Sequence, residues 1–381
     1  MVAWRHSAWG TGGPACVSAR PAAMITGVTH APTLHPPALE EARMVQEAIQ
    51  GLVDGRDLTQ AQATSTMGQI MAGDATPAQI GAFVTALRMK GETVDEVTGL
   101  ASAMRDHATP IAVTRSPIVD TCGTGGDGSH TFNISTAAAF VVAGAGVAVA
   151  KHGSRAASSQ CGSADVLREL GVNVDANPSV VGRCVDEVGI GFLFAIRLHG
   201  AMKHAIGPRR EIGIRTVFNI LGPMTNPAGA RHQLIGVFDG AWTERVAGAL
   251  GRLGSERALV VHGSDGLDEI TLTGATRVSE LRDGAVHTYS LHPGDLGFDL
   301  APAETLKGGD ASQNAAILRE ALGGADGPRR EIVLLNAAAA LVAVGAAEDL
   351  ATGVEAASAS VDSGSATARL DELIRVSNSP E

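Results

Sequence analysis

Aromatic residues are scarce: Phe, Trp and Tyr together make up 3% of the 381 residues. Proteins that bind single-stranded nucleic acid stack its bases on aromatic side chains, so this shortage argues against a base-stacking platform. The formal net charge of −11 points the same way, because proteins that bind the phosphate backbone usually carry a basic face. A local basic groove is still compatible with this composition.

Cysteine is also rare, and the four residues are Cys16, Cys122, Cys161 and Cys184. None forms a Cys-x-x-Cys pair, which disfavours a zinc site or a thioredoxin-like site. We interpret Cys122 and Cys161 as small buried residues at tight turns rather than as a redox pair. This use of cysteine fits a reduced, cytoplasmic compartment.

Long apolar runs are missing too. The most apolar stretches, 137–150 and 332–346, are short and interrupted by Gly or Asn, so neither predicts a membrane-spanning helix. Residues 1–40 are rich in Gly, Pro, Ala and Thr without periodicity and lack the apolar core of a secretory signal. We expect them to be a disordered extension, or to follow an upstream start codon with the folded part beginning near Met44.

The sequence does contain enough apolar residues, 45% of the chain, for the two domains that its length suggests at ~100–200 residues per domain. From residue 41 to 112 apolar residues recur at helical spacing. Thr76-Pro77, and Thr93 followed by Glu96, are signals for the start of a helix. We therefore predict a small all-helical domain over residues 41–112.

Residues 113–381 alternate short apolar runs with helical patterns. This alternation predicts an α/β domain with a mostly parallel central sheet and with ligands at the carboxyl ends of its strands. The Ala-rich stretch 311–374 is predicted to be largely helical and to pack on that sheet. The expected strands are 118–120, 147–150, 191–195, 233–238 and 258–262, followed by 270–273 and 286–290.

Two loops rich in Gly, Ser and Thr follow the first two expected strands. The first spans residues 123–128 and leads into the helix start 133–136; the second spans residues 151–155 and leads into serines up to Ser163. Exposed backbone N–H groups, hydroxyls and a helix start all suit phosphate oxygens. The sequence therefore predicts a phosphorylated sugar between the two loops.

The first loop also fits other patterns less well. The spacing Gly123-x-Gly125-x-x-Gly128 matches a dinucleotide fingerprint, but the acidic residue expected about 20 positions later is replaced by a region that ends in Lys151. No Gly-Lys-Ser/Thr follows, which excludes a Walker loop. Asp127 inside the turn would repel a pyrophosphate unless a metal ion or a sugar hydroxyl meets it.

Charged residues supply further candidates. Lys151 suits a diphosphate, and Arg155 suits either a phosphate or a carboxylate. His152, at a strand end, is either a structural hydrogen-bond donor or a catalytic group. Arg209 belongs to a run of cations in an acidic chain and could bind a carboxylate, although surface salt bridges are the alternative.

Asp268 and Glu269 are adjacent carboxylates that follow an expected strand. Hard oxygen ligands suit Mg²⁺, which binds through one or two carboxylates together with substrate phosphates, and Ser135 could add a hydroxyl oxygen. As a general acid and base we expect the two carboxylates to be too close together and too solvated. A surface pair before a strand is the alternative, and Asp265 is a nearby acidic residue without a predicted role.

Several ordered motifs together resemble a known family. They are GTGGD, NIST, KHG-x-R-A-x-S-S, GSAD, RTVFN-LGP-TNP, the Asp-Glu pair and the late GGDA and LLNAAAAL segments. From about Gln46 to Leu373 the chain resembles the anthranilate phosphoribosyltransferases, which act early in tryptophan synthesis. The resemblance implies a fold like that of the nucleoside phosphorylases, a homodimer formed through the helical part, and no covalent nucleophile.

The resemblance also implies a set of ligand-binding residues. It places Mg²⁺ on Ser135, Asp268 and Glu269, and anthranilate near Gly123, Ser154 and Arg209. It implies that 5-phosphoribosyl-1-diphosphate (PRPP) is held by Gly123, Gly126, Asp127, Thr131, Asn133, Ile134, Ser135, Thr136, Lys151, His152, Gly153, Ser154, Arg155, Ala156, Ala157, Ser158, Ser159 and Ser163.

The chain departs from the family pattern at three positions. Ser154 stands where the family usually has Asn, which affects the anthranilate contact. Ile196 and Gly200 stand where prolines are frequent, which affects loop rigidity rather than chemistry.

Two other functions compete with this interpretation. A pyrimidine-nucleoside phosphorylase would share the fold and a Ser-Arg-Ala-rich second loop, but would use free phosphate and no Asp-Glu metal pair. A non-catalytic, nucleic-acid-binding relative would show a basic helical face and lack the metal pair.

Overall fold

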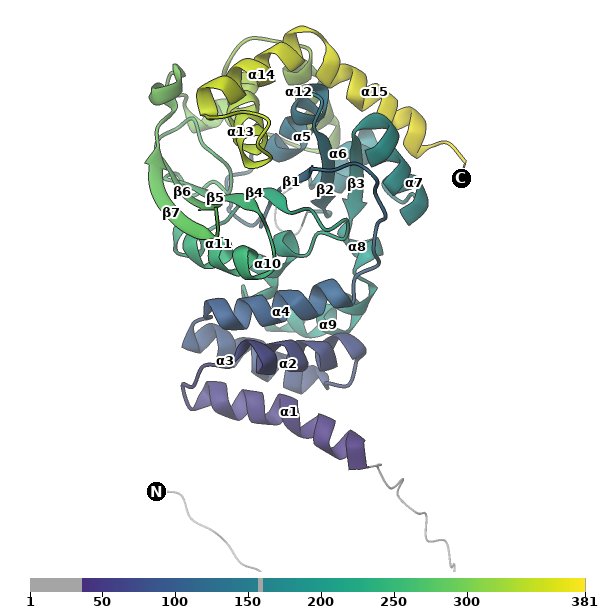
Figure 1. Cartoon of the computed structure of the whole chain (residues 1–381), viewed down its shortest axis with the longest axis vertical. Coiled ribbons are helices and arrows are strands. Elements are labelled where there is room, and N and C mark those ends of the chain that lie inside the picture. The colour runs from purple at the N-terminus through teal and green to yellow at the C-terminus, as the bar shows by residue number, and fades with distance from the viewer. Residues whose placement is uncertain (1–35, 157–159, 381) are drawn as a thin grey trace, which may run out of the picture.

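A computed structural model describes residues 36–156 and 160–380 of the chain, with a helical bundle at one end and a larger α/β part at the other (Figure 1). The expected extension 1–40 lies outside the described residues as far as residue 35, whereas residues 36–40 begin the first helix. The helices of the bundle that come first in the chain are α1 (Pro36–Val53), α2 (Gln60–Ala72), α3 (Pro77–Lys90) and α4 (Val94–Asp106).

Capping boxes define where three of these helices begin. Thr59, Thr76 and Thr93 each accept the N–H of the residue three positions later, whose Gln or Glu side chain accepts the N–H of the threonine in return. The side chain of Glu96 also accepts the backbone N–H of Leu58 at 2.9 Å, which ties α4 to the segment before α2. The predicted helix starts are therefore confirmed.

A later segment completes the bundle. The sequence predicts that residues 113–381 form the α/β domain, but α9 (Lys203–Ile212) packs against α2 and α3 of the bundle. Ala205 and Ile212 of α9 join the same apolar cluster as Ile80 and Phe83 of α3. Charged residues dominate α9 in the sequence and conceal this narrow apolar stripe.

The sheet of the α/β part has seven strands in the order β3-β2-β1-β4-β5-β6-β7. Neighbours from β3 to β5 run parallel, while β6 and β7 are antiparallel, which confirms the mostly parallel prediction. The strands are β1 (Ile118–Gly123), β2 (Ala148–Gly153), β3 (Ile190–Phe194), β4 (His232–Gly236), β5 (Arg257–Gly263), β6 (Thr276–Arg282) and β7 (Ala285–Leu291).

The expected strand 270–273 is wrong, and the strand at this place in the chain is β6. Side chains occupy the backbone groups that a ladder would need: Asn336 accepts the N–H of Ile270 at 2.9 Å and donates to its C=O at 2.9 Å. Thr276 accepts the N–H of Thr271 through its hydroxyl. Residues 270–273 therefore form a buried loop, although their apolar residues alternate as in a strand.

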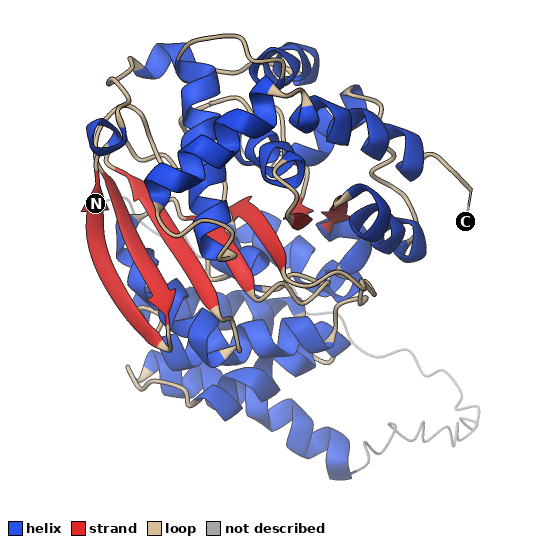
Figure 2. Cartoon of the chain, turned by 45° about the horizontal axis from the view of Figure 1, so that its top comes forward, coloured by secondary structure: helices blue, strands red, loops and turns tan. Residues whose placement is uncertain are grey.

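Helices cover both faces of the sheet (Figures 1 and 2). Because successive residues of a strand point to opposite faces, Leu234 enters one apolar cluster with Leu335 of α13, and Ile235 enters another with Leu100 of α4. Among the described helices, none is both long and apolar enough to cross a membrane. The remaining α-helices are α5 (Ile134–Gly144), α6 (Ser163–Glu169), α7 (Pro178–Arg183), α8 (Ala195–Leu198), α10 (Phe218–Leu221), α11 (Thr243–Arg252), α12 (Ala311–Leu322), α13 (Pro328–Ala343), α14 (Leu350–Asp362) and α15 (Ser365–Ser377).

Short helical turns connect several of these elements. One of them is π-helical and the others are 3₁₀ turns. They are η1 (Cys184–Val188), η2 (Gly200–Met202), η3 (Gly222–Met224), η4 (Gly240–Trp242), η5 (Pro293–Leu296) and η6 (Ala303–Leu306).

Candidate functional site

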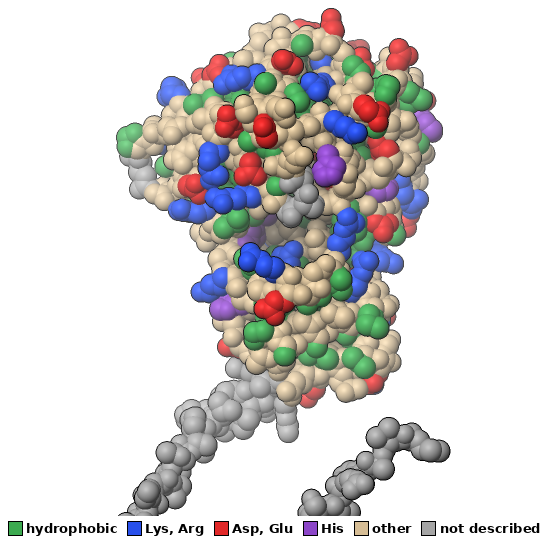
Figure 3. Space-filling model, turned by 180° about the vertical axis from the view of Figure 1, so that it is seen from behind, with side chains coloured by type: hydrophobic (Ala, Val, Ile, Leu, Met, Phe, Trp, Pro, Cys, Tyr) green, Lys and Arg blue, Asp and Glu red, His purple; other side chains and the backbone are tan. Residues whose placement is uncertain are grey.

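The two glycine-rich loops meet at the carboxyl ends of β1 and β2, where ligands of parallel sheets usually bind. This edge of the sheet faces the helical bundle. Figure 3 shows Lys and Arg side chains gathered on either side of a hollow between the two parts of the molecule. An anionic ligand would therefore enter a region of positive potential.

The first loop is fixed at several points. Gly125 and Gly126 have φ angles of 65° and 74°, which only glycine adopts readily. The N–H of Thr124 donates to Gly236 O at 2.9 Å, and the N–H of Gly125 donates to Asp268 Oδ2 at 2.7 Å. Arg215 donates to Gly126 O from the segment after α9. The loop is therefore held by groups that lie outside it.

The Asp268–Glu269 pair is buried, with exposed fractions of 9% and 7%. This burial contradicts both the surface-pair alternative and our expectation of a solvated pair. Asp268 passes over the ends of β1 and β4 because glycine stands there: a Cβ on Gly123 would lie 2.3 Å from Asp268 Oδ2. The side chain of Glu269 reaches α5, where its Oε1 accepts the N–H of Ser135 at 3.0 Å.

The pKa values of both carboxylates are raised, although the charge of Lys151 opposes both shifts. Burial and the neighbouring Asp127 raise the pKa of Asp268 to about 6, and burial and Asp268 raise the pKa of Glu269 to about 8. Asp127 Oδ2 is itself buried without a hydrogen-bond partner. Crowded carboxylates beside the hydroxyl of Ser135 fit a hard divalent cation.

The described residues contain no cluster of three or more His, Cys, Asp or Glu side chains arranged to hold a metal ion. A cation on this pair would therefore complete its coordination with oxygens that the substrate or water provides. Mg²⁺ commonly binds in this way, through few carboxylates and several other oxygens.

Lys151 points into the protein rather than into the open loop. Its side chain is 3% exposed, and its Nζ donates to Thr121 O and lies 3.4 Å from Ser135 Oγ. Burial lowers the pKa of Lys151, and the nearby Asp120 opposes that shift. The charge of Lys151 thus lies behind Ser135, at the rear of the site.

His152 forms a buried pair with His199, and the two Nε2 atoms are 3.1 Å apart. The Nδ1 of His152 lies 3.1 Å from Gly222 O, so Nδ1 carries the hydrogen and Nε2 accepts from His199. Burial, with a contribution from His199, lowers the pKa of His152 to about 3, and burial lowers the pKa of His199 to about 4. These contacts favour the structural alternative for His152.

The second loop is anchored by the GSAD motif. Asp165 Oδ2 accepts the N–H groups of Ala156 at 3.2 Å and Gly162 at 2.9 Å. Ser163 donates to Ser154 O at 3.2 Å, and the Arg155 guanidinium lies 5.8 Å from the centre of the Phe194 ring. The predicted site residues Ala157, Ser158 and Ser159 lie outside the described residues.

The other predicted residues differ in what they offer a ligand. Ile134 and Thr136 are buried in α5, and the hydroxyl oxygen of Thr136 has no hydrogen-bond partner. Thr131 and Asn133 are partly exposed on the return from the first loop. Arg209, half-buried on α9, stacks 5.0 Å from the centre of the Phe218 ring, and burial lowers its pKa.

Sequence reasoning missed residues that support the site from behind. Asp120 is fully buried in β1 and accepts the N–H of His152 at 3.0 Å and the side-chain amide of Asn226 at 2.8 Å. An acidic residue inside an apolar strand was the available signal for Asp120. The role of Arg215 had no such signal, because it depends on how the segment after α9 crosses the first loop.

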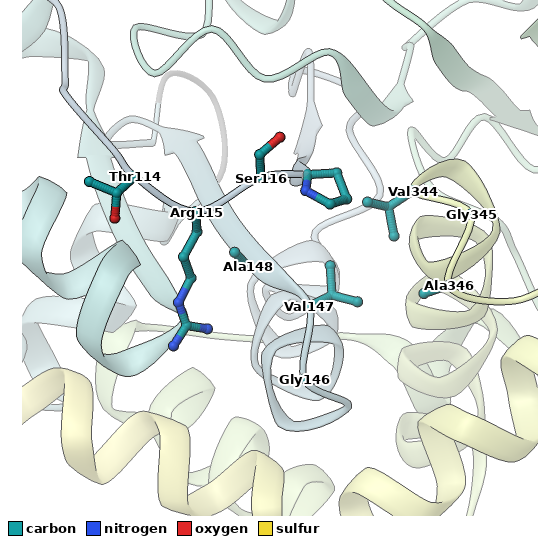
Figure 4. Close-up of a pocket in the computed structure, with 10 residues that line it drawn as sticks. Thr114, Arg115, Ser116, Gly146, Val147, Ala148, Val344, Gly345 and Ala346 are labelled. Carbon is teal, nitrogen blue, oxygen red and sulfur yellow. The ribbon is translucent and has the colours of Figure 1, made fainter.

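A cavity of about 470 Å³ lies elsewhere in the α/β part (Figure 4). Its lining includes Arg115, Pro117, Val147 and Gly345, which precede β1 and β2 or follow α13. It therefore opens at the amino ends of the strands, opposite the glycine-rich loops, and is separate from the candidate site.

A helical bundle on an α/β domain with a site of this kind defines a class of protein. Residues 46–108 match the family described as "Glycosyl transferase family, helical bundle domain", and residues 115–367 match "Glycosyl transferase family, a/b domain". The chain thus belongs to this two-domain class of glycosyl transferase.

Curated relatives narrow the class. The chain is 59% identical to the anthranilate phosphoribosyltransferase of Moorella thermoacetica over 331 residues, covering 87% of this chain and 98% of the relative. It is 57% identical to that of Anaeromyxobacter sp. over 337 residues, covering 88% of this chain and 100% of the relative. The chain belongs to the anthranilate phosphoribosyltransferase family.

Solved structures agree with this assignment. The crystal structure of anthranilate phosphoribosyltransferase from Thermus thermophilus aligns with a TM-score of 0.83 at 44% identity, covering 87% of this chain and 99% of that chain. The Saccharomyces cerevisiae enzyme in complex with PRPP and Mg aligns with a TM-score of 0.80 at 27% identity, covering 89% of this chain and 99% of that chain.

Proposed function

We propose that this chain transfers the phosphoribosyl group of PRPP to the amine of anthranilate, giving N-(5-phosphoribosyl)anthranilate and diphosphate, a step of tryptophan biosynthesis. The observation that carries the proposal is the buried Asp268–Glu269 pair, which contacts the first glycine-rich loop and the start of α5. Family membership supports the same reaction. Neither a phosphorylase nor a nucleic-acid-binding function is favoured by the relatives.

We propose that PRPP lies between the two loops, with the amides of 123–128 and the start of α5 toward its phosphates. Ser135, Asp268 and Glu269 would hold Mg²⁺, whose charge offsets that of the departing diphosphate. The related yeast structure in complex with PRPP and Mg supports a metal in this family. The buried, partnerless Asp127 oxygen supports a cation or a sugar hydroxyl near the first loop.

In the proposed reaction the bond between ribose C1 and the diphosphate oxygen breaks, and its electron pair leaves with the diphosphate. The lone pair of the anthranilate amine forms the new N–C1 bond, and the nitrogen then releases a proton. Loop amides and Lys151 stabilise the departing charge. No covalent nucleophile takes part, so the chain acts by positioning and by electrostatic stabilisation.

Anthranilate carries a carboxylate, and we propose that Arg209 binds it. Arg209 is on α9, across from the glycine-rich loops, and the ring of Phe218 supports its guanidinium plane. Gly123 and Ser154 would lie on the other side of the acceptor. A related yeast structure with 4-fluoroanthranilate supports an acceptor site in this family.

The proposal is tested by following the loss of anthranilate fluorescence with PRPP and Mg²⁺. We expect turnover by the wild-type chain, and loss of at least about 100-fold in kcat/KM for Asp268→Asn and Glu269→Gln, since each removes a preorganised charge. Asp283→Asn, in the exposed turn between β6 and β7, is the matched control and should leave turnover unchanged. Absence of turnover by the wild-type chain, or normal turnover by both site variants, would contradict the proposal.

We further propose a cytoplasmic homodimer that forms through the helical bundle. Val53 and Met89 of the bundle are 67% and 83% exposed, and a second copy on this part of the molecule would cover them. Light scattering of the purified chain tests the dimer, and Met89→Glu should shift it toward monomer.

A further inference from the structure

The segment Leu306–Asn314 contains the GGDA motif, to which the proposed reaction gives no role. It lies against the return from the first loop. Phe132 donates its N–H to Leu306 O at 3.2 Å, and Gly308 donates its N–H to His130 O at 2.9 Å. Between these bonds, Thr131 and Lys307 face each other in an isolated antiparallel bridge.

This contact is close and held from behind. A Cβ on Gly308 would lie 2.8 Å from the backbone of Phe132, so only glycine allows the two segments to approach this closely. Arg329 of α13 donates to Thr305 O at 3.1 Å and to Lys307 O at 3.3 Å. The backbone of Lys307 is therefore fixed relative to Thr131.

Asn314 connects the segment to both loops. It is 2% exposed, accepts the N–H of Gly309 at 2.8 Å, and donates to Asn133 Oδ1 at 3.0 Å. Asn133 in turn donates to Cys161 O, beside the second loop, at 3.2 Å. Asn133 precedes α5 but makes no capping bond with its side chain, because its amide is used in this chain of contacts.

Lys307 has the geometry to face the same ligand as Thr131. Residues that pair in an antiparallel bridge project their side chains to one face, with Cβ atoms about 4.5–5.5 Å apart. None of the ion pairs in the described part of the chain involves Lys307, although Glu304 and Asp310 are near it in sequence. Asp310 instead caps α12 by accepting the N–H of Gln313.

We infer that Leu306–Asn314 forms a third wall of the PRPP site, in which Lys307 contacts a phosphoryl group beside Thr131 and Asn314 positions Asn133. This inference rests on the proposed function for the presence of PRPP. It adds two roles to that proposal: Lys307 provides a positive charge for one phosphoryl group, and Asn314 links the two loops.

The role of Lys307 is tested by calorimetric titration of the full chain with PRPP and Mg²⁺. We expect Lys307→Met to weaken PRPP binding about tenfold or more, which is typical of losing a hydrogen bond to a charged group, and Lys307→Arg to retain most of the affinity. Arg282→Met, which removes an exposed cation at the carboxyl end of β6, is the matched control. If Lys307→Met binds PRPP as the wild type does, the inference is wrong and the proposed function stands; if the wild type fails to bind PRPP, both are wrong.

The role of Asn314 is tested by comparing Asn314→Ala with Asp349→Ala, which removes the cap of another helix, α14, outside the site. Both should lower the melting temperature. Only Asn314→Ala should also raise the KM for PRPP, about tenfold, with a smaller change in the KM for anthranilate. Equal KM values for PRPP in the two variants would overturn the positioning role.

Discussion

Single buried residues set the electrostatics of this protein. Asp120, Lys151, Asp268 and Glu269 are all buried near one another, so each charge depends on groups that neutralise or solvate it. Asp120 accepts hydrogen bonds from the N–H of His152 and the amide of Asn226, Asp268 accepts the N–H of Gly125, and Glu269 accepts the N–H of Ser135. Because the pKa values of Asp268 and Glu269 are raised, added positive charge beside this pair would stabilise its ionised form.

Because His152 and His199 are buried together, we expect the stability of the chain to depend on pH. In the folded chain the pKa of His199 is lowered to about 4, whereas an unfolded histidine takes up its proton near pH 6.5. Between these values the unfolded state binds more protons, so the free energy of unfolding falls as the pH falls from 6.5 toward 4. From pH 7 to 5 we expect the pKa shift of His199 to cost about 1–2 kcal/mol.

The matched variant is His199→Gln, which keeps an N–H donor for His152 but cannot titrate. Urea unfolding at pH 7 and pH 5 should show a smaller acid-induced loss for this variant than for the wild type. His287→Gln, on the exposed face of β7, should behave as the wild type does. An unchanged acid-induced loss in His199→Gln would contradict the prediction.

Replacing Arg209 should weaken the binding of anthranilate more than the binding of PRPP. We expect Arg209→Gln to raise the KM for anthranilate about tenfold or more, and the KM for PRPP less, because a guanidinium–carboxylate pair is lost. Arg209→Lys should recover only part of the affinity, since an ammonium lacks the planar fork that stacks on Phe218. Initial-rate measurements with each substrate varied in turn check this, with Arg210→Gln as the exposed control on the same helix.

At the scale of elements, the site depends on two strands that end in glycine. β1 ends at Gly123 and β4 ends at Gly236, and the segment with Asp268 passes directly over both. A Cβ on Gly236 would lie 1.5 Å from the backbone oxygen of Asp268. The segment with Asp268 can thus lie this close to β4 only because Gly236 has no side chain.

Gly236→Ala should therefore displace the segment with Asp268. We expect a loss of about 3 kcal/mol in the free energy of unfolding, typical of severe overpacking, together with loss of turnover. Gly68→Ala is the control, because Gly68 is in α2 and the added Cβ would meet no atom within 4 Å, and it should stabilise the chain by about 0.5–1 kcal/mol. Denaturant unfolding of both variants measures whether each change lowers or raises the free energy of unfolding.

The sequence predicts those elements whose conformation is determined by residues close together in the chain. Thr93 with Glu96, and the glycines of the first loop, carry their conformation in a few neighbouring residues. The burial of Asp268 and Glu269 could not be predicted, because it depends on Gly236, which is remote in the sequence. The stretch 270–273 was misassigned because Asn336 of α13, also remote, takes its backbone groups.

At the scale of the whole molecule, the helical bundle and the α/β part share one apolar cluster. Leu100 and Phe83 of the bundle belong to the same cluster as Ile235 and Val260 of the sheet. Arg105 of α4 adds bonds across the boundary, to Met224 O at 2.8 Å and to Leu253 O at 2.9 Å. The two parts should therefore unfold together, although they match separate family descriptions.

This coupling is tested with Leu100→Ala, which should cost about 2–5 kcal/mol by creating a cavity. Urea transitions followed by circular dichroism and by the fluorescence of the buried Trp242, in a background where Trp4 and Trp9 are replaced by Phe, should shift together. Arg88→Ala, at an exposed position of α3, should shift neither transition. A shift in circular dichroism without a shift in the Trp242 signal would show that the bundle unfolds on its own.

The return of the chain to the bundle at α9 restricts how the hollow between the two parts can widen. The polypeptide crosses the boundary after α4, again before α9 and once more after α9, and the last crossing carries Arg215 to the first loop. Covalent connections at several points oppose twisting of one part against the other and leave bending as the easier relative motion. Any widening of the hollow that moves this segment away from the first loop would break the hydrogen bond from Arg215 to Gly126 O.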